Sequence, residues 1–495
     1  HCLSKRLKQA IFVAIFNSLN TIMLYIIQKY FMDNLKGTSE AVFKQGILNI
    51  EQQSRIKMED DWTDLMHEDL CKFLSALNTI LLLKELINSQ ENIYRYAGIR
   101  KVNVTLANGR RVKVPSAVFI HQPKRGRGRK PKRNSDVTRH PALELLGFIN
   151  RKSPEFVSTV VRTACACSSF ESAAVELRWR GINISPEHIR SLSYMYADLL
   201  MAKRVESTLD GSEKQAGLKL EITIDGGRAR IKENVKKKNG VRKKGSYEGN
   251  WREPVLFSIR VLNSKGELEK SVPQLIDATM QNWEKSFQLL EKYLRCYNLA
   301  DAKEINFLAD GSQSIWRHVR PMMQRLKVKN YSEIVDHMHA VQNMNNVIDL
   351  LQKHQSCNVH FDKCKNHILD LLWQGKISTI KNYLVDAFGT SRKYKKEALK
   401  KMTNYFGNNE RFQYAKRKDE GRPVGSGTVE SAVRRVINMK IKSNGIFWYS
   451  DNCERMLYLR SQLLTNRWKI LEGKVDKIRF NLYELSDLNI FQLAT

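Results

Sequence analysis

Alternation of apolar and polar residues predicts several β-strands in the middle of this chain. In LKLEITID (218–225) every second residue is apolar, and the strand ends at Asp225. VLFSIRVLN (255–263) reads as a second strand that turns back towards a third. EINFLAD (304–310) is another strand that also ends in an aspartate, and a short strand follows at 332–336. We expect these segments to share one sheet.

Apolar residues at helical spacing predict helices between and after these strands, beginning with 280–299. Strands followed by a helix and further strands predict an α/β fold, a mixed sheet covered by helices. We therefore expect a core formed by 217–338 and 421–465, interrupted by a helical insertion at 339–420. Residues 466–495 are expected to form a C-terminal tail.

The N-terminal part is predicted to be mostly helical, with one β-hairpin. Residues 1–95 read as amphipathic helices. The uncharged stretch 9–28 has polar residues in its middle, which favours a buried amphipathic helix, or upstream sequence read in frame, over a membrane span. Region 96–135 contains a predicted hairpin at 100–120, with its turn at Asn108-Gly109, followed by a basic linker.

Residues 136–210 are predicted to be helical and to include a helix–turn–helix. Gly181 ends one helix, and Ser185 can cap the next, with Pro186 at its first position. This spacing fits a DNA recognition helix at about 187–200. An ordinary helical hairpin has the same pattern, so the two interpretations remain open.

The charge of the chain points to a polyanionic partner. Its 495 residues contain 83 Lys and Arg against 51 Asp and Glu, a net charge of +32. Nucleic acid is the first expected partner and an anionic membrane surface the second. A hydrophobic content of 42% excludes a wholly disordered chain. The eight scattered cysteines form no disulfide framework and favour a reducing, cytoplasmic compartment.

The basic linker KRGRGRKPKR (124–133) has seven basic residues in ten and no acidic one. It resembles an AT-hook, a flexible arm that lays arginines in the minor groove of A·T-rich DNA. A solvated linker or a localisation signal would have the same composition. If the arm binds DNA, we expect the contacts to come from Arg125, Arg127, Arg129 and Lys130.

Three carboxylates stand out as candidate metal ligands. Asp225 and Asp310 each end a strand and precede a glycine, and Glu430 begins a helix in GSGTVESAVRR (425–435). Three clustered carboxylates need a cation, and oxygen ligands select Mg²⁺ or Mn²⁺. Each residue alone also fits a turn or a helix-dipole role. Basic residues behind the glutamate would hold the phosphates of DNA: Arg434, Arg435, Lys440 and Lys442.

These segments resemble a known family. TIDGGRARI (223–231), FLADGSQSIW (307–316) and GSGTVESAVRRVINMKIKSNGIFW (425–448) resemble the signature blocks of bacterial insertion-sequence transposases with a DDE core. The likeness is greatest to the ISKra-type group. DHMH (336–339) resembles the Asp-x-x-His element of the related Mutator-like transposases. The resemblance covers about residues 95–465.

The resemblance implies an RNase H-like catalytic core in which Asp225, Asp310 and Glu430 are catalytic and bind two Mg²⁺ or Mn²⁺ ions. It gives Asp336 and His339 accessory positions. The implied activity is binding of terminal inverted repeats, followed by DNA cleavage and strand transfer. It also implies double-stranded DNA as element ends and target, a homo-oligomer in the synaptic complex, and a place beside the bacterial nucleoid.

Other interpretations remain open at this point. An RNase H-like structure-specific nuclease, or a non-catalytic DNA-binding protein derived from a transposase, would carry the same residues. A membrane-anchored basic protein is a further alternative that rests only on residues 9–28. The His and Cys residues of 354–367 fit either a zinc site or a polar helix. The chain has no Gly-rich phosphate loop followed by Lys and Ser or Thr, which argues against ATP-driven chemistry.

Overall fold

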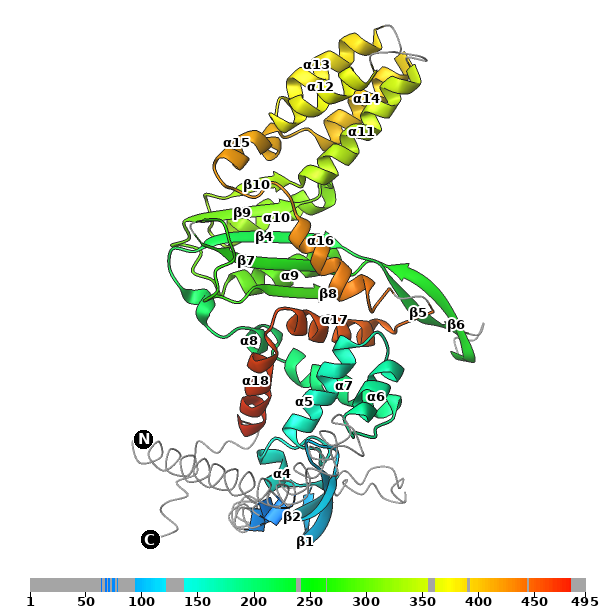
Figure 1. The fold of residues 1–495 in the computed structure, drawn as a ribbon, viewed down its shortest axis with the longest axis vertical. Helices are drawn as coiled ribbons and strands as arrows, with labels where there is room; N and C mark the ends of the chain where they lie inside the picture. The colour runs from blue at the N-terminus through cyan, green and yellow to red at the C-terminus, as the bar shows by residue number, and fades with distance from the viewer. Residues whose placement is uncertain are drawn as a thin grey trace, which may run out of the picture. The chain divides into compact units, whose positions relative to one another are not determined.

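Two compact units make up the protein (Figure 1). One comprises 1–159, 176–184 and 476–495, and the other comprises 160–175 and 185–475. The computed structural model describes residues 94–121, 138–236, 242–263, 265–354, 361–389, 392–442 and 445–481, with single positions between 64 and 78.

The first unit contains the predicted β-hairpin. Strands β1 (Tyr94–Thr105) and β2 (Arg111–His121) are antiparallel, and β3 (Thr138–Arg139) pairs with β2. The turn holds Gly109 at a φ of 84°, a conformation that glycine adopts without strain. The prediction at 100–120 is thus confirmed. One face of the hairpin packs on the short helix α4 (Pro141–Leu145) and forms a core that includes Val104, Val112, Val114, Leu143 and Phe148.

Several predictions concern residues outside the described ranges. These include the uncharged stretch 9–28 and the basic linker with Arg125, Arg127, Arg129 and Lys130. Residues 355–360 of the His and Cys segment 354–367 are also outside them. These predictions stay predictions. None of the helices in the described ranges is both long and apolar enough to span a bilayer.

A five-stranded mixed sheet forms the centre of the second unit, as the sequence predicted. The strands lie in the order β10-β9-β4-β7-β8. Strands β4, β7 and β8 are antiparallel neighbours, whereas β9 is parallel to both β4 and β10. Their bounds are Lys219–Gly226 for β4, Val255–Leu262 for β7, Leu275–Thr279 for β8, Glu304–Ala309 for β9 and Ser332–Val335 for β10.

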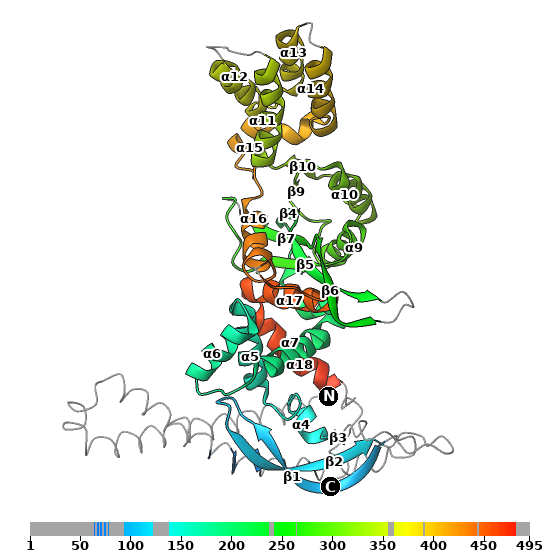
Figure 2. The ribbon, with the colours of Figure 1, turned by 90° about the vertical axis from the view of Figure 1, so that its right-hand side faces the viewer.

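Helices cover both faces of this sheet, which explains why its central strand is buried on both sides. Figure 2 shows α9 (Trp283–Leu294) and α10 (Gln313–Arg325) on one face, and α16 (Gly427–Val433) and α17 (Ser450–Leu464) on the other. Glu221, in the first half of β4, is only 3% exposed, and its charge is neutralised by Arg260 at 2.8 Å.

The predicted helical insertion is present between β10 and α16. Its helices α11, α12, α13 and α14 pack on one another, and the short helix α15 leads back to the sheet (Figure 1). Apolar side chains such as Met344, Ile368, Leu384 and Met402 fill the space between them. The bounds are His337–His354, Phe361–Trp373, Ile377–Phe388, Arg392–Tyr405 and Tyr414–Asp419.

The helices before the sheet agree with the predicted helical region. They are α5 (Pro154–Ala166), α6 (Phe170–Trp179), α7 (Pro186–Met201) and α8 (Arg204–Thr208). Ser185 caps α7 by accepting a hydrogen bond from the His188 N–H, as expected. The apolar side of α7 packs against α17. A role of α7 in reading DNA stays a prediction.

The tail expected from residue 466 onwards is in fact partly integrated into the second unit. Arg467 is fully buried and donates hydrogen bonds to the carbonyl oxygens of Thr208 and Gln274. In helix α18 (Trp468–Asn481), the ring of Trp468 stacks on Tyr196 of α7 at 6.0 Å. The predicted boundary at 466 was therefore wrong, because these side chains complete the core.

Candidate functional site

Asp225 and Asp310 lie at the same edge of the sheet. Strands β4 and β9 are parallel with Ile224 opposite Ala309, so Asp225 near the end of β4 and Asp310 directly after β9 lie at the same level. The Asp225 carboxylate accepts a hydrogen bond from the Gly226 N–H at 2.7 Å, and that of Asp310 accepts one from Gly311 at 2.5 Å. The predicted placement of the two aspartates is confirmed.

Glu430 lies in the first turn of α16, and its helix packs on β4 and β7. Val429, Ala432 and Val433 form the buried side of this helix, whereas the Glu430 side chain is 47% exposed. The turn that follows α16 lies close to the residue after β4, Gly227. A Cβ at Gly227 would lie only 2.5 Å from the Ile437 Cδ1, so glycine favours this close approach. The helix thus brings the third carboxylate to the sheet edge where β4 ends.

Asp336 joins the start of the insertion to the start of α16. It follows β10 and is only 1% exposed. Its Oδ1 accepts the His339 N–H at 2.9 Å, and its Oδ2 accepts the Ser426 O–H at 2.8 Å and the Ser426 N–H. Since Ser426 directly precedes α16, Asp336 fixes the position of both His339 and Glu430. The sequence had marked this residue as accessory without giving it a role.

His339 completes the cluster from the side of α11. Its Nε2 lies 3.7 Å from Oε1 of Glu430. One ligand atom from each of Asp336, His339 and Glu430 lies within 4.8 Å of the others. Both Asp336 oxygens already accept hydrogen bonds from the protein, so that residue is better suited to positioning than to metal binding.

The electrostatics of the site centre on Asp225. The pKa of its carboxyl is raised to about 6, chiefly by burial and then by the nearby charges of Asp310 and Glu430. The Gly226 N–H and His339 oppose this shift. An ionised Asp225 is therefore costly in this site unless a cation compensates.

The residues present fit a hard divalent cation. Asp225, Asp310 and Glu430 offer carboxylate oxygens, the donors that Mg²⁺ and Mn²⁺ prefer. A bound cation would favour the ionised form of Asp225, whose pKa is raised chiefly by burial and then by the charges of Asp310 and Glu430. His339 adds an imidazole nitrogen, which suits Mn²⁺ better than Mg²⁺.

Tyr405 is a residue of the candidate site that sequence reasoning missed. From the end of α14 it donates its O–H to the Asp310 Oδ1 at 2.9 Å and accepts the Gly311 N–H at 3.2 Å. Burial, and next the charge of Asp310, raise the pKa of Tyr405, which keeps the O–H a donor. The two residues are 95 positions apart, so no local pattern could have paired them.

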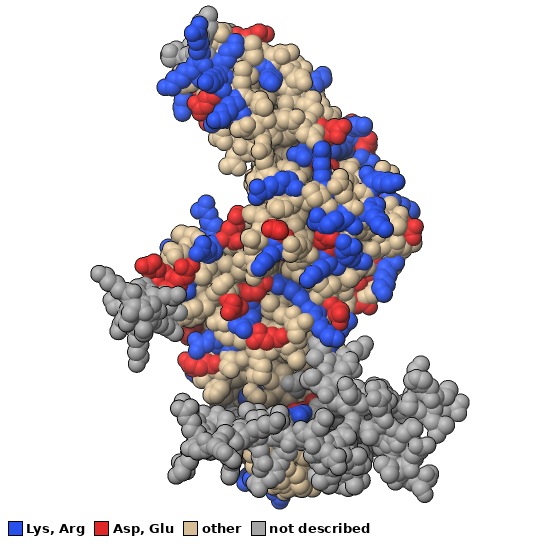
Figure 3. Space-filling view, turned by 180° about the vertical axis from the view of Figure 1, so that it is seen from behind, with Lys and Arg blue, Asp and Glu red and all other residues tan. Residues whose placement is uncertain are grey.

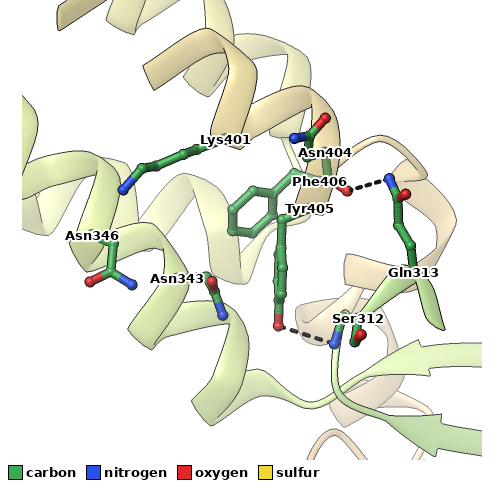
Figure 4. Close-up of a pocket in the computed structure, with 9 residues that line it drawn as sticks. Ser312, Gln313, Asn343, Asn346, Lys401, Asn404, Tyr405 and Phe406 are labelled. Carbon is green, nitrogen blue, oxygen red and sulfur yellow. Dashed lines mark hydrogen bonds between the residues drawn. The ribbon is translucent and has the colours of Figure 1, made fainter. Parts of the chain in front are cut away.

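A polar cavity of about 420 Å³ adjoins this contact (Figure 4). It lies between the loop after Asp310 and the helices α11 and α14 of the insertion. Amide side chains predominate in its lining, with one cation. The lining residues are Gly311, Ser312, Gln313, Asn343, Asn346, Lys401, Asn404, Tyr405 and Phe406.

Substitution of Gly311 by alanine is expected to disturb this contact. A Cβ at Gly311 would lie 2.2 Å from Cζ of the Tyr405 ring, so either α14 or the Asp310 loop must move. We expect the free energy of unfolding to fall by about 1–3 kcal/mol. Urea unfolding followed by circular dichroism measures it.

Gly473→Ala is the matched control for this prediction. Gly473 lies inside α18, and a Cβ there meets no atom within 4 Å. The added methyl should raise the free energy of unfolding by about 0.5–1 kcal/mol through helix propensity. Equal changes in both variants would contradict the packing described for Tyr405.

The basic residues predicted behind Glu430 divide into two groups. Arg434, Arg435 and Lys442 are exposed, as phosphate contacts require. Lys440 is only 1% exposed, and its Nζ donates hydrogen bonds to the carbonyl oxygens of Ala164 and Cys167 at the end of α5, each at 2.7 Å. The prediction that Lys440 contacts DNA was therefore wrong, because its charge is used inside the fold.

Comparisons with known proteins give no relative for this arrangement. No family model, no curated protein and no solved structure matches the chain.

Proposed function

We propose that the protein is a DNA transposase with a DDE-type active site formed by Asp225, Asp310 and Glu430. The observation that carries this proposal is that Asp225 and Asp310 lie at one sheet edge, with Glu430 of α16 near enough for its charge to raise the pKa of Asp225. Carboxylates gathered in this way, in a chain of net charge +32, favour metal-dependent chemistry on a polyanion.

The fold supports an RNase H-like core. The first three strands of the sheet are antiparallel neighbours, and β9 and β10 add in parallel on the other side of β4. A helical insertion separates β10 from α16, which is the arrangement the resemblance implies. Open sheets of this kind hold their ligands at the carboxyl ends of their parallel strands, where Asp225 and Asp310 lie.

Each residue has a part in the proposed reaction. Asp225, Asp310 and Glu430 would hold two Mg²⁺ or Mn²⁺ ions, which when bound supply Lewis acidity and lower the pKa of an attacking water or 3′-hydroxyl. Tyr405 orients Asp310, and Asp336 fixes His339 and the start of α16. Arg434, Arg435 and Lys442 hold the DNA backbone. Synapsis of two element ends requires at least a dimer.

A strand-transfer assay separates this proposal from its alternatives. The full chain is incubated with Mg²⁺, target DNA and pre-cleaved duplexes that carry the ends of its element. A transposase joins the 3′-ends to the target. A structure-specific nuclease cuts the DNA without joining it, and a retained DNA-binding protein binds the ends without either reaction.

A further inference from the structure

A two-stranded ribbon leaves the sheet beside the candidate active site. Strands β5 (Ala229–Lys236) and β6 (Arg242–Arg252) are antiparallel and form a separate sheet. Figure 1 shows the ribbon continuing from the end of β4 and projecting away from the central sheet. β4 ends at Asp225-Gly226 and β5 begins three residues later, so a molecule bound along the ribbon would have one end beside Asp225.

The two faces of this ribbon differ. Ala229 and Ile231 are buried, so Arg230 and Lys232 must point to the opposite side. Arg230 lies opposite Trp251, and Lys232 lies opposite Gly249. The outward face of the ribbon therefore carries two cations and an aromatic ring.

The segment after α16 adds more rings to this face. The Trp448 N–H donates to the Arg230 carbonyl at 3.0 Å, and the Lys232 N–H donates to the Trp448 carbonyl at 2.6 Å. This pairing places Phe447 on Gly249, where a Cβ would lie 2.5 Å from the Phe447 ring. The missing side chain at Gly249 is thus what lets Phe447 lie on the ribbon.

Rings hold both cations of this face. The guanidinium of Arg230 lies 4.8 Å from the centre of the Trp251 ring and 5.5 Å from that of Phe447. The ammonium of Lys232 lies 5.7 Å from the centre of the Tyr449 ring. Trp251 is nevertheless 51% exposed, a large apolar surface for a residue with a structural role only.

We infer that this surface, formed by Arg230, Lys232, Trp251, Phe447 and Tyr449, binds the sugar–phosphate backbone of the double-stranded DNA that enters the active site. The inference rests on the proposed function for its choice of DNA. It adds a binding site that is separate from the three carboxylates and from the basic residues that follow α16, Arg434, Arg435 and Lys442.

Three physical arguments favour this ligand. A guanidinium held by two rings has less side-chain entropy to lose when it pairs with a phosphate. The major groove of B-DNA is wide enough to admit a two-stranded β-ribbon, with the phosphates along its edges. The stretch 228–252 has ten Lys and Arg against two Glu, so the ribbon attracts a polyanion.

The test measures binding without chemistry. The full chain carrying Asp225→Asn is titrated in EDTA against a fluorescein-labelled DNA duplex, and anisotropy is followed at increasing NaCl. Adding Arg230→Met should weaken binding about tenfold and lower the slope of log affinity against log salt by about one. Trp251→Ala should weaken binding too, but have little further effect once Arg230 is replaced.

Arg252→Met is the matched control. It removes the same charge from the same ribbon, but Arg252 follows Trp251 on the other face and pairs with Glu233 at 2.7 Å. Its effect on affinity should be less than about twofold. Thermal unfolding of every variant establishes that the fold is retained.

Two results would overturn the inference. Equal losses for Arg230→Met and Arg252→Met would mean that only net charge matters. Tighter, Trp251-dependent binding to an RNA duplex or to anionic phospholipid vesicles would assign the surface to another partner. The assay contains no metal and measures no cleavage, so its result is independent of the strand-transfer result. A chain that is inactive in strand transfer can still show the Arg230 effect on binding, and an active transposase can still lack it.

Discussion

Replacing Asp225 with asparagine is expected to raise the free energy of unfolding of the metal-free protein by about 2–3 kcal/mol above pH 6. The reason is that burial raises the pKa of this carboxyl to about 6 from 3.8. The folded protein therefore keeps a proton that the unfolded chain releases between these values. Stability falls as pH rises through this window, and asparagine, which has no charge, avoids the loss.

The same substitution should abolish binding of Mn²⁺, because it removes a negative charge from the set of three carboxylates. Urea unfolding in EDTA at neutral pH and near pH 4 measures the first effect, which should vanish at the lower pH. Titration with Mn²⁺, read by electron paramagnetic resonance, measures the second. If the variant is less stable than the wild type at neutral pH, the Asp225 carboxylate stabilises the fold, which contradicts this prediction.

Replacing Arg204 with methionine is expected to lower the free energy of unfolding by about 3–5 kcal/mol. Arg204, on α8, donates two hydrogen bonds to Asp277 of β8, at 2.6 and 2.7 Å, and one to Glu454 of α17 at 2.5 Å. Asp277 is fully buried. Methionine fills a similar volume but leaves that carboxylate without its cation. Two uncharged donors remain, the O–H of Tyr293 and the N–H of Ala278, each at 2.8 Å.

Arg455→Met is the matched control for Arg204. Arg455 pairs with Asp198 between α17 and α7 at 2.6 Å, but the Asp198 side chain is 53% exposed. Water replaces this partner, so the loss should stay within about 1 kcal/mol. Chemical unfolding of both variants measures the two changes in the free energy of unfolding. Similar losses would show that the buried Arg204 contacts stabilise the fold no more than an exposed ion pair does.

The sequence could predict those parts of the site that depend on local patterns. Period-two alternation ended at Asp225 and Asp310, and two parallel strands necessarily bring such ends to one edge. Glu430 followed from the glycine-flanked start of its helix. All three positions depend on neighbours within a few residues, which is why they could be read before the fold was known.

The contacts that join distant elements could not be predicted in this way. The bond of Tyr405 to Asp310 spans 95 positions, and that of Ser426 to Asp336 spans 90. Lys440 was misplaced for a related reason. A π-helical turn (Arg434–Asn438) follows α16 and changes the direction of the side chains after it, so that Lys440 points to the end of α5. Burial there lowers the pKa of Lys440 to about 8.

Cleavage of DNA that carries the ends of the element, in Mg²⁺, tests the central claim most directly. Wild type is compared with Asp225→Asn, Asp310→Asn and Glu430→Gln, and DNA affinity is measured in parallel. We predict that wild type cleaves at the ends, and that each variant binds DNA as well but cleaves at least about a hundredfold more slowly. Variants that cleave as fast as wild type would contradict the assignment of the three carboxylates.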